Sequence, residues 1–175
     1  MNIPNALTVL RLIAVPFFGY FIFSKQYLIA VIIYSIASLT DMLDGFIARK
    51  YNMITSWGKI ADPVADKLMQ LTAIIILNAQ GKIPIMLVVL AFLKDIILGI
   101  GSYLLYRQNN LIAQANWYGK LTTVILYFTI VAVLFNLPYS NILVIISLLS
   151  VLFSLFMYAI KFIRIKNDKS DKAIL

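Results

Sequence analysis

Four aspartates lie close together in the chain, at Asp41, Asp44, Asp62 and Asp66, although only seven residues are acidic and 62% are hydrophobic. An ionisable group inside an apolar segment costs about 2.5–3.5 kcal/mol on insertion scales, so it usually marks a site or a pathway. Carboxylates are hard oxygen ligands, and the absence of cysteine and histidine favours Mg²⁺ or Mn²⁺ over zinc or copper. Four of them suit a pair of divalent ions, a common device for displacement at phosphate esters. The residue types therefore predict metal-assisted phosphoryl chemistry.

The spacing of these residues is helical. Two sets each follow one helical stripe, namely Asp41, Asp44, Gly45 and Ala48, and then Gly58, Asp62 and Asp66. If the two helices pack antiparallel across the connector 50–57, all four carboxylates can face one another. Their mutual repulsion then requires cations to neutralise them. Arg49 adds a fixed positive charge for phosphate oxygens.

The whole pattern reads Asp-x2-Asp-Gly-x2-Ala-Arg-x8-Gly-x3-Asp-x3-Asp. It resembles the signature of the CDP-alcohol phosphatidyltransferase family, and every signature position is matched. Residues 2–11, with the sequence NIPNALTVLR, are similar to the N-terminus of the family's bacterial phosphatidylglycerophosphate synthases and related cardiolipin synthases. The resemblance covers most of the chain.

The resemblance implies an enzyme that uses two divalent cations, Mg²⁺ or Mn²⁺. It implies metal binding by Asp41, Asp44, Asp62 and Asp66, with Asp66 also acting as the general base. By the same resemblance the CDP moiety is surrounded by Gly45, Ala48, Arg49 and Gly58. Members of the family usually form homodimers, so a homodimer is expected.

The reaction implied is transfer of a phosphatidyl group from CDP-diacylglycerol to the hydroxyl of glycerol 3-phosphate, with release of CMP, in phosphatidylglycerol biosynthesis. An acceptor phosphate needs cations, and the candidates are Arg11, Lys67, Lys94, Arg107 and Lys120. The pair Lys94-Asp95 stands where phosphatidylglycerophosphate synthases commonly carry Arg-Glu, and its order is similar to the Arg-Asp of cardiolipin synthases. Phosphatidylglycerol, serine and inositol therefore remain alternative acceptors.

Composition predicts an all-α integral membrane protein, because the chain of 175 residues has a mean hydropathy of +0.94. Six transmembrane helices are expected at 6–24, 28–49, 58–79, 83–106, 118–136 and 140–161. They form one domain over 1–161, followed by a basic cytoplasmic tail over 162–175. The first apolar stretch carries Arg11 without a basic leader, so we expect it to remain as a helix rather than act as a secretory signal.

The distribution of lysine and arginine predicts the orientation. Lys25 and Lys82 are the only cations in the first and third loops, whereas most of the others lie on the opposite side. The positive-inside rule makes that side cytoplasmic, with both termini there and the site at the cytoplasmic ends of helices two and three. We expect a multi-pass protein of the cytoplasmic membrane.

Several other functions are weighed against this one. The net charge of +8 lies partly in the tail, where contact with anionic lipid is favoured over nucleic acid. The chain has no histidine or cysteine, which excludes catalytic triads that use histidine and also excludes phosphohistidine intermediates. The phospholipase-D-like route is excluded for the same reason. An ion-coupled transporter using the same acids, or a non-catalytic membrane scaffold, remains as a different class of function.

Overall fold

The computed structural model describes the backbone of residues 3–50, 58–109 and 117–172, and the side chains of 5–41, 43, 50, 58, 61–100 and 117–161. Every regular element in these ranges is an α-helix. The helices are α1 (Ile3–Phe23), α2 (Tyr27–Lys50), α3 (Gly58–Ala79), α4 (Ile85–Asn109), α5 (Trp117–Leu134) and α6 (Ser140–Lys172). Each predicted range overlaps one of these helices, although α4 begins at Ile85 rather than at 83 and α5 ends at Leu134 rather than at 136. Helix α6 continues beyond the expected end at residue 161 into the basic tail.

Three of these helices are long and apolar enough to cross a membrane, as judged from the described residues. They are Asn5–Phe23, Trp117–Leu134 and Ser140–Lys161, with mean hydropathies of 2.0, 1.5 and 2.6. Helix α2 contributes a shorter apolar stretch, Tyr27–Asp41. Many large apolar side chains also face outward, including Phe17, Phe128 and Phe156. Since a bilayer is the environment in which such surfaces are stable, the chain is a membrane protein.

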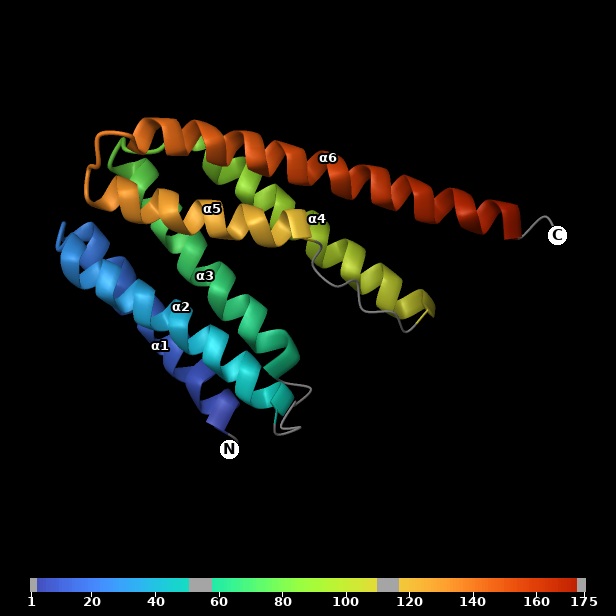
Figure 1. The fold of residues 1–175 in the computed structure, drawn as a ribbon, viewed down its shortest axis with the longest axis horizontal. Coiled ribbons are helices and arrows are strands. Elements are labelled where there is room, and N and C mark those ends of the chain that lie inside the picture. The colour runs from blue at the N-terminus through green and yellow to red at the C-terminus, as the bar shows by residue number, and fades with distance from the viewer. Residues whose placement is uncertain (1–2, 51–57, 110–116, 173–175) are drawn as a thin grey trace. The chain divides into compact units, whose positions relative to one another are not determined.

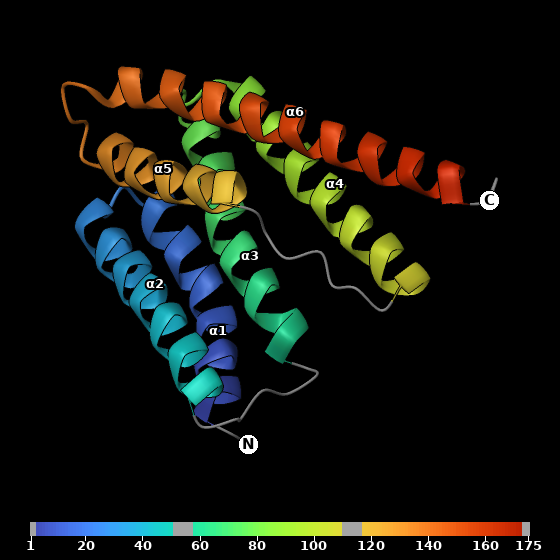
Figure 2. The same ribbon diagram turned by 45° about the vertical axis from the view of Figure 1, so that its right-hand side comes forward.

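The chain forms two compact units. The first unit contains residues 1–84 together with Ile130–Pro138, and the second contains residues 85–129 and 139–175. In the first unit α1 packs extensively against both α2 and α3, whereas α2 and α3 contact each other over fewer residues. Figures 1 and 2 show α2 running back along α1, and α3 then returning in the direction of α1.

Small residues allow the helices of the first unit to approach closely. A methyl group built on Gly19 of α1 would lie 3.0 Å from Cγ2 of Thr72 on α3, which leaves no room for a larger side chain. Ala61, Ala65 and Ala73 are buried on α3 and recur every four residues or a multiple of four, so they form one stripe. Small side chains at helix interfaces are typical of membrane proteins, where close packing rather than hydrophobic burial drives association.

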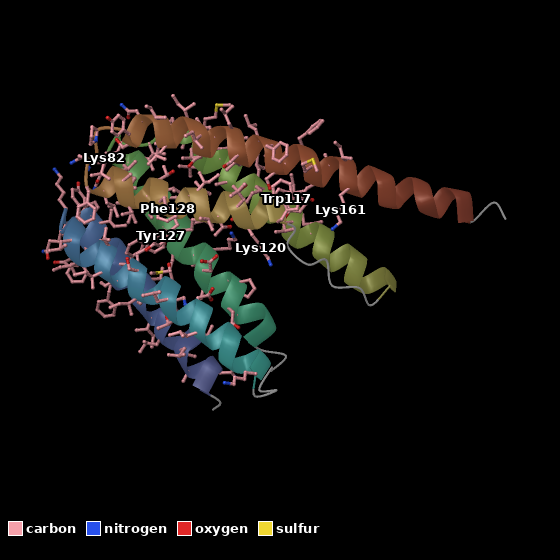
Figure 3. The ribbon with its side chains drawn as sticks, viewed as in Figure 1. Lys82, Trp117, Lys120, Tyr127, Phe128 and Lys161 are labelled. Atoms are coloured by element: carbon pink, nitrogen blue, oxygen red, sulfur yellow. The ribbon has the colours of Figure 1, made fainter. Side chains whose placement is uncertain are left out.

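At one end of the first unit, several polar side chains contact one another, and we call this group the loop cluster: Tyr27, Gln80, Lys82 and Asn136. Gln80 donates to the carbonyl of Ile22 at 2.9 Å and accepts from the hydroxyl of Tyr27 at 3.2 Å. The ammonium of Lys82 donates to Asn136 at 2.9 Å and lies 4.1 Å from the centre of the Tyr27 ring. Figure 3 marks the position of Lys82. The cluster connects the segments that follow α1, α3 and α5.

The second unit contains α4, α6 and most of α5. Hydroxyl groups hydrogen-bond between α5 and α6: Thr122 donates to the carbonyl of Ser150 at 3.2 Å, and Thr129 and Ser147 share a bond of 2.7 Å. Gly119 of α5 lies directly under Tyr158 of α6, because a methyl group on Gly119 would collide with the tyrosine hydroxyl oxygen. Shape and hydrogen bonding therefore both fix the register of these two helices.

Candidate active site

The described part of the aspartate motif lies at one end of the first unit. Asp41 is near the C-terminal end of α2, and Asp62 and Asp66 are in the first half of α3. In both ribbon views these helix ends lie beside the N-terminal half of α1 (Figures 1 and 2). Helix α1, which carries none of the four motif aspartates, is therefore part of the candidate site.

Arg11 of α1 forms an ion pair with Asp41 of α2. The guanidinium Nη1 lies 2.5 Å from Oδ1 of the carboxylate. The arginine side chain is 2% exposed and the aspartate side chain is 39% exposed. The arginine is thus enclosed by the helices, while its partner keeps a surface that a ligand can reach.

Thr8, one helical turn before Arg11, contacts the second helix of the motif. Its hydroxyl donates a hydrogen bond to Oδ1 of Asp62 on α3. Thr8 is completely buried. Residues three apart in a helix share a face, so α1 contacts Asp41 and Asp62 from one side.

Asp66 shares a small pocket with Asp41 in the interior of the first unit. The lining residues come from α1, α2 and α3: Arg11, Tyr34, Ala37, Ser38, Asp41, Asp66 and Met69. Oδ2 of Asp66 lies 3.9 Å from the ammonium of the neighbouring Lys67, and both side chains are partly exposed. The predicted base therefore lies at a pocket with a second carboxylate and a buried cation.

The donor chemistry of this end fits hard divalent cations, since its described acids offer only carboxylate oxygens. Among the described side chains, no three acids come together as a group that could hold a metal ion. Asp41 and Asp66 share the pocket, while Asp62 is directed towards Thr8. That four carboxylates face one another stays a prediction, because the side chain of Asp44 lies outside the described residues.

The remaining predicted site residues of α2 are Asp44, Gly45, Ala48 and Arg49. Their backbone belongs to the helix, but their side chains lie outside the described residues. Gly58 is buried at the first residue of α3. Helix α3 is continuous through Pro63, which directly follows Asp62.

The candidate acceptor cations are divided between the two units. Arg11 and Lys67 contact motif aspartates in the first unit. Lys94 is 2% exposed in the second unit and lies 3.2 Å from Oδ1 of its neighbour Asp95. Lys120 is exposed and projects from α5 (Figure 3). Arg107 belongs to α4, and its side chain lies outside the described residues.

Thr8 was not predicted as a site residue. The available signal was a threonine three residues before an arginine in an otherwise apolar helix, within the stretch whose resemblance to the family was already noted. A single threonine in a membrane helix usually bonds to its own backbone, so the sequence alone did not distinguish it from Thr129 or Thr122.

Comparison with known proteins identifies the family. A family model described as CDP-alcohol phosphatidyltransferase matches residues 1–157. A protein of Aquifex aeolicus named CDP-diacylglycerol--glycerol-3-phosphate 3-phosphatidyltransferase is 32% identical over 171 residues, which cover 92% of this chain and 96% of that protein.

Two further relatives agree with this assignment. A probable phosphatidylglycerophosphate synthase of Mycobacterium tuberculosis is 35% identical over 147 residues, or 80% of this chain and 68% of that protein. A Rickettsia bellii protein with the same name as the Aquifex relative is 41% identical over 93 residues, about half of each chain. The resemblance found in the aspartate pattern is thus confirmed. The chain belongs to the CDP-alcohol phosphatidyltransferase family and is a membrane transferase.

Proposed function

We propose that this enzyme transfers the phosphatidyl group of CDP-diacylglycerol to glycerol 3-phosphate, producing phosphatidylglycerophosphate and CMP. The observation that carries the proposal is the pairing of a complete aspartate signature with relatives named for this reaction, one of which matches along nearly its whole length. The pocket shared by Asp41 and Asp66 supports it, because two carboxylates and a cation meet at the end where the signature lies.

Enzymes of this family generally use divalent cations. In our proposal Asp41, Asp44, Asp62 and Asp66 hold two of them, Mg²⁺ or Mn²⁺. When bound, such ions supply positive charge that polarises the reacting phosphate and stabilises the leaving oxygen. The partial exposure of the Asp41 side chain is consistent with this role, since a ligand must reach the carboxylate.

Asp66 is the proposed general base. The acceptor hydroxyl oxygen forms a bond to the β-phosphorus of the liponucleotide, and the bond from that phosphorus to the oxygen of CMP breaks. The hydroxyl proton passes to the carboxylate of Asp66, and CMP leaves with the electron pair of the broken bond. Lys67, whose ammonium lies 3.9 Å from this carboxylate, keeps positive charge beside it.

Substrate binding is assigned to residues within the aspartate signature and to cations outside it. Gly45, Ala48, Arg49 and Gly58 would surround the CDP group, the small residues leaving space and Arg49 binding phosphate oxygens. For the acceptor phosphate we propose Lys94, Arg107 and Lys120. The pairing of Arg11 with Asp41 favours a different role for that arginine, argued in the next subsection.

The proposal also includes the membrane arrangement. All six helices cross the cytoplasmic membrane, and both termini and the aspartates lie on the cytoplasmic side, where a nucleotide headgroup can enter. The protein acts as a homodimer, and the tail over 162–175 lies in the cytoplasm.

The test is CMP release by the purified protein with CDP-diacylglycerol and Mg²⁺. Glycerol 3-phosphate, phosphatidylglycerol, serine and inositol are offered in separate reactions, and the lipid product is identified. Acceleration by glycerol 3-phosphate alone supports the proposal. Selective use of phosphatidylglycerol would instead make the protein a cardiolipin synthase, and no CMP release with either Mg²⁺ or Mn²⁺ would contradict the whole reaction class.

A further inference from the structure

Helix α1 has one buried stripe with two different halves. Thr8 and Arg11 form its polar half, and Phe18 and Ile22, both fully buried, form its apolar half. The apolar half packs in the core, where Phe18 stacks on Tyr34 of α2 with ring centres 5.1 Å apart. Two polar side chains at the other end of the same stripe need a reason to be buried, because an apolar bundle does not solvate them.

The contacts of the polar half are specific. Thr8 donates to Asp62 of α3, and Arg11 donates to Asp41 of α2 at 2.5 Å. Each partner engages the Oδ1 atom of its aspartate, and a carboxylate has two oxygens with about four acceptor sites. The two contacts therefore restrain the direction of both carboxylates.

The hydrogen bond from Thr8 to Asp62 is of a different kind from the local bonds that other helical hydroxyls make. Ser38, Thr122 and Thr129 each donate to the carbonyl four residues earlier in their own helix. Such a bond satisfies a buried hydroxyl locally. Thr8 reaches a charged oxygen on another helix, 54 residues away in the sequence, and a bond to a charged group is stronger and more directional.

We propose that Thr8 and Arg11 are positioning residues that orient Asp62 and Asp41 for the divalent cations. This inference rests on the proposed function, because it concerns the same carboxylates. Outer groups that hydrogen-bond to metal ligands set the orientation of those ligands, and their loss typically lowers metal affinity 10–100-fold. Because α2 and α3 contact each other over fewer residues than either contacts α1, α1 is well placed to set both carboxylates at once.

Thr8 offers the cleaner test, because it is uncharged. Thr8→Val removes the hydroxyl, keeps the shape and leaves the charge of the site unchanged, whereas a change at Arg11 also alters the local potential. Thr8→Ser keeps a hydroxyl and should restore function. Thr129→Val is the matched control, since Thr129 is equally buried but bonds to Ile125, Leu143 and Ser147 rather than to an acid.

The experiment measures Mn²⁺ binding to the full-length protein in detergent by electron paramagnetic resonance, with CMP release assayed on the same samples. We expect Thr8→Val to bind Mn²⁺ about tenfold or more weakly, with Thr8→Ser and Thr129→Val close to the wild type. If Thr8→Val does not fold, Thr8→Ala removes the same hydroxyl without adding bulk, and the same loss is expected.

Two results would overturn the inference: Mn²⁺ affinity unchanged in the Thr8 variants, or an equal loss in Thr129→Val. Asp62→Asn identifies which proposal has failed. If Asp62→Asn loses Mn²⁺ and Thr8→Val does not, the positioning role is wrong while the metal assignment stands. A wild-type protein that binds Mn²⁺ but releases no CMP would contradict the proposed function and leave the positioning result valid.

Discussion

The ion pair between Arg11 and Asp41 should make an asymmetric contribution to stability. Its arginine is almost fully buried at 2% exposure, whereas its aspartate is 39% exposed. Asp41→Asn leaves the arginine charge enclosed while the carboxylate of this ion pair is neutralised, and breaking a buried pair in this way costs about 3–5 kcal/mol. Arg11→Met leaves a carboxylate that water can reach, so we expect a smaller loss of about 2 kcal/mol, typical of one hydrogen bond to a charged group.

The coupling energy between Arg11 and Asp41 can be bounded from the distance between their charged groups. Unit charges separated by 2.5 Å attract by about 1.7 kcal/mol in water and by about 7 kcal/mol at an effective dielectric constant of about 20. Because the Asp41 side chain is partly exposed, we expect a value near the lower bound, about 2 kcal/mol. The double variant should then be about as stable as Asp41→Asn alone.

The assay is a double-mutant cycle on the free energy of unfolding, measured by SDS titration in mixed micelles with EDTA present, so that bound cations do not contribute. Thr129→Val, in the second unit, serves as the control, because its effect on the free energy of unfolding should add to the effect of either change. A coupling below about 0.5 kcal/mol, or a larger loss for Arg11→Met than for Asp41→Asn, would refute the reasoning.

Other outcomes follow from the same structure. Asp66→Asn should lower the rate of CMP release about 10²–10⁴-fold while the melting temperature is retained, and near-normal turnover would exclude Asp66 as the base. Gly119→Ala should destabilise the protein by about 1–3 kcal/mol, because the new methyl group collides with the Tyr158 hydroxyl oxygen; combining it with Tyr158→Phe should recover most of the loss in thermal unfolding. Since the chain has no cysteine, Lys25→Cys and Lys50→Cys can be labelled singly in intact cells. A membrane-impermeant maleimide should label Lys25→Cys from outside and Lys50→Cys only after permeabilisation, and the reverse pattern would invert the proposed topology.

The helices were predictable from the sequence because polar residues interrupt the apolar stretches at regular places. Lys25 and Gln26 separate the first two helices, and the segment from Gln80 to Pro84 separates the third and fourth. The helical boundaries therefore followed from local composition. The residues of the family signature were equally readable, because each has a fixed spacing from the next along one chain.

Helix packing was less predictable. Direct facing of α2 and α3 was expected from the motif, yet α1 is the main packing partner of both. That arrangement depends on features such as the close approach of Gly19 to Thr72, which become visible only when two helices are placed together. The contact of Thr8 with Asp62 depends on the same placement, and so does the pairing of Arg11 with Asp41, because these partners lie 54 and 30 residues apart in the sequence.

The loop cluster gives α1 a fixed end. Gln80 donates to the carbonyl of Ile22 and is itself bonded by Tyr27, so the last turn of α1 is attached to the segments that follow it and α3. At 1.5 Å per residue, Thr8 lies about 21 Å along the helix axis from Ile22. The anchored end of α1 is therefore remote from the carboxylates that Thr8 and Arg11 contact.

Over this length, a small change in the tilt of α1 becomes a large displacement of Thr8. A tilt of about 5° at the anchored end would displace Thr8 by about 2 Å, which exceeds the range of distances over which a hydrogen bond persists. A substitution such as Gln80→Leu, in the segment after α3 and far along the chain from the motif residues of that helix, would then change the chemistry by moving Thr8 relative to Asp62. In our proposal, the packing at the anchored end of α1 is therefore a requirement for metal affinity at the other end of the helix.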